Sequence, residues 1–150
     1  MNIKTLGLLV IPATCYFMVA CSSDSAPAVP LETPIGDISG DWDVVETVTS
    51  AQDCNSTEVY VITITQTVNS LSVTGTAGGL VTGTVSDDAL KLTGSRPFDI
   101  GTITYSSITG TVNATCSMMN LNTTWTYTEP GFSCSGTGTM EATRLGGGSC

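Results

Sequence analysis

The sequence of 150 residues has no histidine and only four basic side chains. Without histidine, no Ser-His or Cys-His nucleophile can form. The 13 acidic residues give the chain a formal net charge of −9. A surface of this charge repels the phosphates of nucleic acids and of anionic lipid headgroups. We therefore predict a protein that binds no nucleic acid and has no histidine-based catalytic site.

Paired carboxylates are the remaining candidates for acid–base chemistry. They form two groups, which are Asp37, Asp41 and Asp43 near the start of the folded domain, and Asp87 with Asp88 further on. Solvated turn positions explain both groups more simply. The segment "DISGDWD" also lacks the spacing of an EF-hand loop. We predict that the protein is not an enzyme and has neither a metal site nor a cofactor.

Helical periodicity is missing as well, because no long window repeats its apolar residues at helical spacing. Charged residues make up only 11% of the chain and hydrophobic residues 41%, so the sequence is not that of a disordered polyelectrolyte. Its 26 threonines and 16 glycines are typical of strands joined by many turns. The composition and length together indicate one β-rich domain.

The first twenty residues, "MNIKTLGLLVIPATCYFMVA", place Lys4 before an apolar run of the size of a secretory signal. In the segment "MVACSSDS", which starts at Met18, Ala20 directly precedes Cys21, and this resembles the lipobox of bacterial lipoproteins. The resemblance implies that Cys21 is diacylated and becomes the first residue of the mature protein. Met18 occupies the position where a lipobox usually has leucine. An ordinary signal peptide followed by an unrelated cysteine is the alternative.

The segment after Cys21, "SSDSAPAVPLETP", is rich in serine, proline and alanine, as expected of a flexible tether. Ser22, next to the lipidated cysteine, resembles signals that permit transport to the outer membrane. We therefore predict a signal peptide at 1–20, a lipidated cysteine and tether at 21–37, and a folded domain at 38–150. The expected location is the bacterial cell envelope, with a lipid anchor in the outer membrane.

Six cysteines are present, of which Cys15 lies in the predicted signal and Cys21 carries the predicted lipid. The remaining four are Cys54, Cys116, Cys134 and Cys150. An even number of cysteines in an exported chain indicates disulfides. A zinc site is the weaker alternative, because these four cysteines lack C-x-x-C spacing and there is no histidine.

Eight short strands are predicted downstream of Ile38, and nearly all of them are joined by tight turns, so sequential neighbours should pair antiparallel. The predicted strands are Trp42–Val48, Glu58–Thr67, Leu71–Thr76, Leu80–Val85, Ala89–Ser95, Thr102–Ala114, Met119–Thr128 and Ser133–Arg144. The predicted turns include Asn69-Ser70, Gly78-Gly79, Asp87-Asp88 and Glu129-Pro130-Gly131. Arg96 and Pro97 are placed in a longer loop.

Apolar residues alternate with polar ones along these strands and so mark one buried face. That face also carries glycines, at Gly75, Gly83, Gly94, Gly110, Gly136 and Gly138. Inner glycines permit the strong coiling that closes an eight-stranded sheet into a barrel without exposed edges. A break in the alternation predicts a β-bulge near Ser106-Ser107. We predict an all-β, eight-stranded antiparallel up-and-down barrel, with a two-sheet β-sandwich as the alternative.

The segment "SGDWDVVET" contains Gly40-x-Trp42 at the entry to the first strand, which resembles the Gly-x-Trp signature of lipocalins and the wider calycin group. In that group the tryptophan plugs the closed end of the barrel, and a basic side chain from the last strand covers it. Arg144 ends the last predicted strand in the inward register. The resemblance therefore implies that Gly40, Trp42 and Arg144 close the barrel. The second lipocalin motif and the helix after the barrel are missing, which favours a small and largely filled barrel.

The barrel implied by this resemblance also suggests how the cysteines pair. Cys54 and Cys134 should lie at one rim and Cys116 and Cys150 at the other, so we predict these two disulfides. The resemblance implies non-catalytic binding of a small apolar ligand at the open end. The candidate contacts are Tyr60, Phe98, Trp125, Tyr127 and Phe132. The alternative is a protein-binding, inhibitor-like or structural module of the envelope with a filled barrel.

Overall fold

A computed structural model describes residues 36–50, 52, 54–147 and 150 of the chain. The predictions for the signal peptide, for Cys21 and for most of the tether fall outside these residues. The described residues contain no helix that is long and apolar enough to cross a membrane.

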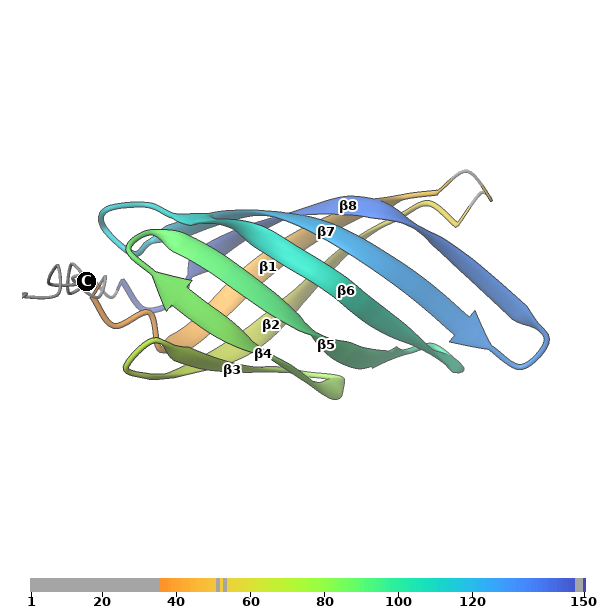
Figure 1. Cartoon of the computed structure of the whole chain (residues 1–150), viewed down its shortest axis with the longest axis horizontal. Coiled ribbons are helices and arrows are strands. Elements are labelled where there is room, and N and C mark those ends of the chain that lie inside the picture. Colours follow the sequence, from red (N-terminus) through yellow and green to blue (C-terminus); the bar gives the residue numbers. More distant parts are fainter. Residues whose placement is uncertain (1–35, 51, 53, 148–149) are drawn as a thin grey trace, which may run out of the picture. The chain divides into compact units, whose positions relative to one another are not determined.

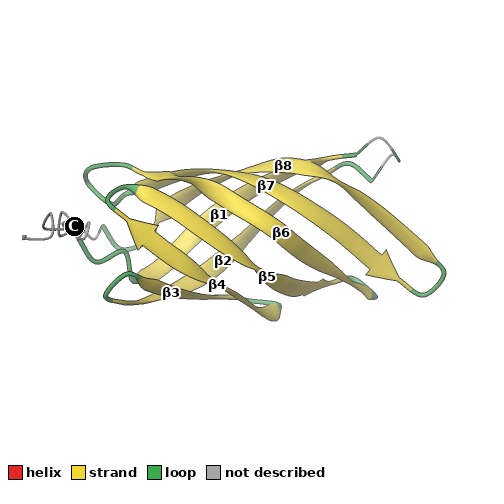
Figure 2. Ribbon diagram, in the orientation of Figure 1, coloured by secondary structure: helices red, strands yellow, loops and turns green. Residues whose placement is uncertain are grey.

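The described residues form one closed barrel of eight antiparallel strands, each paired with the next along the chain (Figure 1). The strands are β1 (Gly40–Thr49), β2 (Ser56–Thr67), β3 (Ser70–Gly75), β4 (Gly78–Ser86), β5 (Ala89–Phe98), β6 (Gly101–Val112), β7 (Met118–Glu129) and β8 (Phe132–Arg144). Pairing of β1 with β8, from Trp42↔Arg144 to Thr49↔Thr137, closes the sheet. Figure 2 shows that the strands are linked only by loops and turns. The predicted up-and-down barrel is confirmed, and the sandwich alternative is wrong.

Side chains alternate between the inside and the outside along the strands, and the inward-facing apolar side chains fill the barrel. In β7, Met119, Leu121 and Trp125 are buried, while Asn120, Asn122 and Thr126 are exposed. Gly83 and Gly110 also face inward, and a Cβ atom at either position would overlap a backbone oxygen of the neighbouring strand. These two glycines therefore allow neighbouring strands to approach more closely than other residues would permit. The predicted bulge is present as a register shift between Tyr105 and Ser107.

Several predicted boundaries are wrong. β5 continues through Arg96 and Pro97 to Phe98, because these residues pair with β6 rather than forming a loop. The β3–β4 turn is made by Thr76 and Ala77, while Gly78 and Gly79 already belong to β4.

Two further boundaries differ by one or two residues. Val68 and Asn69, rather than Asn69 and Ser70, form the β2–β3 turn. β6 ends at Val112, so Ala114 is exposed in a loop instead of lying on the inner face.

The β3–β4 hairpin is shorter than the hairpins around it. β3 has 6 residues and β4 has 9, whereas β7 has 12 and β8 has 13. The rim of the barrel is therefore uneven, and the β3–β4 turn extends less far along the barrel than the other connections at that end (Figure 1). This step in the rim exposes the side of β2 that faces the hairpin.

Candidate functional site

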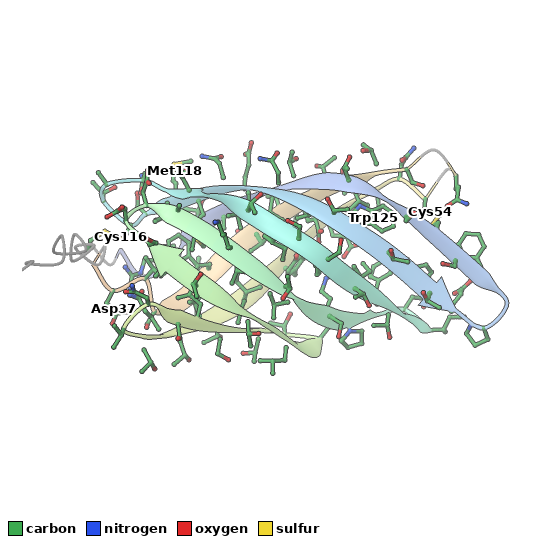
Figure 3. All side chains as sticks on the ribbon, in the orientation of Figure 1. Asp37, Cys54, Cys116, Met118 and Trp125 are labelled. Carbon is green, nitrogen blue, oxygen red and sulfur yellow. A yellow bond between two sulfur atoms is a disulfide. The ribbon has the colours of Figure 1, made fainter. Side chains whose placement is uncertain are left out.

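The barrel has two distinct ends. We call the end where β1 starts the closed end, and the end that holds the β1–β2, β3–β4, β5–β6 and β7–β8 connections the mouth. Figure 3 shows Cys54 at the mouth and Cys116, with Asp37, at the closed end. Disulfides join Cys54 to Cys134 and Cys116 to Cys150, with Cα–Cα distances of 6.6 and 5.2 Å. This is the pairing predicted from the sequence.

Trp42 seals the closed end. Its side chain is fully buried, and its indole N–H donates a hydrogen bond of 3.1 Å to the carbonyl of Ile38. The Arg144 guanidinium lies 5.7 Å from the Trp42 ring centre, as the Gly-x-Trp resemblance implied. Arg144 also donates to the backbone carbonyls of Asp37, at 3.2 Å, and Ser39. Hydrogen bonds from Ser39 lower the pKa of the Asp37 carboxyl.

A cluster of polar side chains closes the interior below the mouth. Glu46 of β1 is only 1% exposed, and its carboxylate accepts hydrogen bonds from the hydroxyls of Tyr60, at 2.8 Å, and Tyr105, at 2.8 and 3.0 Å. Arg96 of β5 donates to Glu46, at 3.0 Å, to Glu58 of β2, at 3.0 Å, and to the Tyr105 hydroxyl, at 2.9 Å. We call these five residues the mouth cluster. It draws on four strands, so only the closed barrel assembles it.

Two aromatic rings lie close to the guanidinium of Arg96. Its guanidinium carbon lies 4.7 Å from the ring centre of Tyr60 and 5.4 Å from that of Phe98. Desolvation opposes the charge of Arg96, but the neighbouring Tyr105, Tyr60 and Glu46 outweigh it and raise the pKa of this guanidinium. Burial, together with the charge of Glu46, raises the pKa of the Tyr60 and Tyr105 hydroxyls, so both remain protonated donors at neutral pH.

The interior holds a cavity of only about 60 Å³, lined mostly by aliphatic side chains and reaching Tyr60, Arg96 and Tyr105 of the mouth cluster. Pockets for drug-sized ligands usually measure about 300–1,000 Å³. The barrel is therefore largely filled, as the missing lipocalin features suggested.

A larger cleft, of about 350 Å³, lies outside the mouth cluster at the part of the rim formed by the β3–β4 turn. Its lining combines Glu58 and Tyr60 of β2, the β3–β4 turn, the end of β5 from Arg96 to Phe98, and Asp99 in the turn that follows. Tyr60 and Arg96 line both spaces, so they stand between the cleft and the interior cavity.

Of the predicted ligand contacts, Tyr60 and Phe98 lie in this cleft. Tyr127 lies next to Phe98 and Phe132 at the rim, with ring centres 5.8 and 6.4 Å apart. A hydrogen bond to Glu129 raises the pKa of the Tyr127 hydroxyl to about 12. Trp125 is 2% exposed and belongs to the core. Phe98 and Phe132, which lie outside the predicted strands, are instead the last residue of β5 and the first of β8.

Sequence reasoning missed Glu46, Glu58, Arg96 and Tyr105. A signal was present, because Glu46 shares the inward register of Val44 and Val48, and Arg96 shares that of Leu90 and Leu92. A charge on the inner face of each of two strands indicates that the two charges meet inside the barrel. Placing Arg96 in a loop concealed this signal.

The acidic residues singled out in the sequence lie elsewhere. Asp41 accepts a hydrogen bond of 2.7 Å from Thr63 at the closed end, and Asp87 and Asp88 form the β4–β5 turn. Among the described residues, no three acidic or cysteine side chains are grouped as a metal site would require.

A comparison with models of known protein families finds no match for this sequence, and a comparison with curated proteins finds none either. The fold and the site define an eight-stranded up-and-down barrel that is sealed at one end and has a polar cluster and a cleft at the other.

Proposed function

We propose that this chain is a lipid-anchored protein of the bacterial cell envelope whose barrel is a non-catalytic binding module, and that it contacts a partner protein at its mouth. The observation that carries the proposal is the filled interior, with about 60 Å³ of free space. A barrel filled to this extent has no room for a lipid-sized molecule, so recognition falls to the rim.

The rim has the features of a contact surface. Two exposed apolar side chains lie there, Ile100 at 72% exposure and Phe132 at 46%, and the Phe132 ring lies beside that of Tyr127. Apolar and aromatic side chains are the usual anchors of protein interfaces. The described chain enters the barrel at the closed end, next to Ile38, so the mouth is the end of the barrel opposite the start of the folded domain.

A small, partly apolar ligand in the cleft is the second candidate. The volume of about 350 Å³ and the rings of Tyr60 and Phe98 favour it. In this case the ligand would rest on the mouth cluster without entering the barrel.

Site-specific photo-cross-linking in the intact envelope tests the proposal. A photoreactive residue at Ile100, at the mouth, should yield adducts with another protein. The matched control is Leu145, which is 46% exposed at the closed end and should yield none. Adducts of equal yield at both positions would contradict the proposal. A copurifying small molecule in native mass spectra, with no protein adduct at Ile100, would favour the second candidate.

The lipid anchor is tested separately. The Cys21→Ala variant should move from the membrane fraction to the soluble fraction and should lose labelling by a fatty-acid analogue. Continued labelling of the variant would show that the anchor lies elsewhere.

A further inference from the structure

The wall of the barrel has a gap beside β2. β2 pairs with β1 down to Val48↔Ser56, but its pairing with β3 begins only at Ile62↔Gly75. On the other side of the gap, pairing of β4 with β5 stops at Leu80↔Ser95. The cleft at the mouth lies in this gap. Within the described residues, β2 from Ser56 to Tyr60 therefore has a strand partner on one side only.

The free edge of β2 directs identifiable backbone groups into the gap. The Thr76 N–H donates to the Val61 carbonyl at 3.1 Å, so the backbone groups of Val61 face the β3 side. In an antiparallel strand, residues two apart direct their N–H and C=O groups to the same side. Thr57 and Val59 therefore present two donors and two acceptors to the gap. Val59 is 67% exposed, so the outer face of β2 is little covered beside this edge.

The opposite border of the gap is a poorer template. There β5 runs from Arg96 to Phe98, and its central residue, Pro97, has no N–H to donate. An added strand is therefore expected on the β2 edge.

Side-chain chemistry defines what such a strand would carry. On the inner face, Glu58 and Asp99 line the cleft. Arg96, the one cation among the described lining residues, is already bonded to Glu46 and Glu58. A basic side chain on the inner face of the added strand would balance this excess of negative charge. On the outer face, Val59 lies opposite Val45, and they are 67% and 41% exposed. Apolar side chains of the added strand would cover these valines.

We propose that the β2 edge at Thr57 and Val59 binds an extended segment of a partner protein as an added strand, with a basic residue between two β-branched apolar residues. This inference rests on the proposed function, since it names the structure that the partner presents at the mouth. Backbone hydrogen bonds hold such a segment, and its alternating side chains provide specificity. A second copy of this chain fits less well, because antiparallel pairing of two β2 edges centred on Glu58 sets two glutamates opposite each other.

The peptide acetyl-Thr-Val-Arg-Val-Thr-amide is the probe for this test. Titrated into the full chain in detergent micelles, it should slow hydrogen exchange of the Thr57 and Val59 amides about tenfold or more, and leave that of Leu145 unchanged. The control peptide carries N-methyl groups on both valines, which removes two donors and keeps every side chain. It should bind about tenfold more weakly or worse, and so should a peptide with glutamate in place of arginine.

Variants of the protein provide the reciprocal test. Val59→Pro removes the N–H that faces the gap but spares the pairing with β1, and should weaken binding of the plain peptide about tenfold. Val59→Thr keeps the backbone donor and should change the affinity less than about threefold. If Val59→Pro does not fold, the N-methylated peptide still decides the question.

Three results would overturn the inference. The plain peptide does not bind, or it binds as well as the N-methylated peptide, or the chain dimerises without peptide and Val59→Pro abolishes the dimer, which makes a second copy the occupant. Protein adducts at Ile100 together with no peptide binding would leave the mouth as the contact surface and refute only the added strand. Peptide binding without adducts at Ile100 would instead refute the proposed envelope contact.

Discussion

The two ends of the barrel are each closed by an arginine stacked on an aromatic ring, but the two arginines bind different partners. At the closed end, Arg144 donates to the backbone carbonyls of Asp37 and Ser39. At the mouth, Arg96 donates to two carboxylates and a tyrosine hydroxyl. A backbone carbonyl is neutral at every pH and can accept a hydrogen bond from water in place of the arginine. A buried carboxylate is charged and needs its cation. Loss of the arginine should therefore destabilise the barrel little at the closed end and strongly at the mouth.

The largest losses of stability at both ends are expected from the disulfides, with a somewhat larger loss at the mouth. Replacing both Cys54 and Cys134 by alanine, at the mouth, removes a link across 80 residues, whereas the Cys116 and Cys150 double variant, at the closed end, removes one across 34. Loop-closure entropy predicts losses in the free energy of unfolding of about 4.5 and about 3.8 kcal/mol. Urea unfolding of the two double variants measures both losses. A larger loss at the closed end would reverse this part of the comparison.

The next largest effect is expected from Arg96→Met. Glu46 is 1% exposed, so the variant leaves a buried carboxylate without its cation and should lower the free energy of unfolding by about 3 kcal/mol. Adding Glu46→Gln to Arg96→Met removes the stranded charge and should restore part of the loss. A loss below about 1 kcal/mol, measured by urea unfolding, would mean that the mouth cluster is no more demanding than a surface ion pair.

Arg144→Met should have a smaller effect, a loss of about 1 kcal/mol. The variant gives up the cation–π contact with Trp42, while the carbonyls of Asp37 and Ser39 can bind water instead. The same urea unfolding measurement applies. A loss equal to that of Arg96→Met would remove the distinction between the two ends.

The smallest effect is expected from the ionisation of the mouth-cluster tyrosines, which leaves the free energy of unfolding unchanged at neutral pH and lowers it in alkali. The pKa values of Tyr60 and Tyr105 are raised from the ordinary value of 10.0. Above about pH 10 the unfolded chain releases these two protons and the folded chain keeps them, so the free energy of unfolding should fall as the pH rises further.

Phenolate absorbance during an alkaline titration, together with urea unfolding at about pH 9 and about pH 11, measures this dependence. Tyr105→Phe serves as the control and should reduce the slope of stability against pH. Ordinary titration of both tyrosines near pH 10 in the folded protein would contradict the burial of the cluster.

The sequence predicted well those features that depend on local pattern. Alternation identified the inner faces of all eight strands, as Leu71, Ile108 and Met140 illustrate, because a side chain in a strand can point only inward or outward. It predicted less well where two patterns compete. Gly78-Gly79 resembles a turn but starts β4, and Arg96-Pro97 resembles a loop but lies in β5, because pairing with the neighbouring strand outweighs the local preference.

The mouth cluster shows what local pattern could not supply. Glu46 and Arg96 are 50 residues apart in the chain, and each alone on an inner face is only an unfavourable buried charge. Their pairing depends on the distance across the closed barrel, which no short stretch of sequence encodes.

The sequence by itself determined the β-rich composition, the strand order and the inner face of the sheet, because these follow from residue types, turn spacing and side-chain periodicity. It indicated the Trp42–Arg144 seal through the Gly-x-Trp resemblance. Only the tertiary structure decided that Arg96 meets Glu46 and Glu58 inside the barrel and that the short β3–β4 hairpin leaves the edge of β2 unpaired. These features arise from how far each strand extends once the sheet has closed on itself, and the relative heights of distant strands are set by the register of the whole barrel.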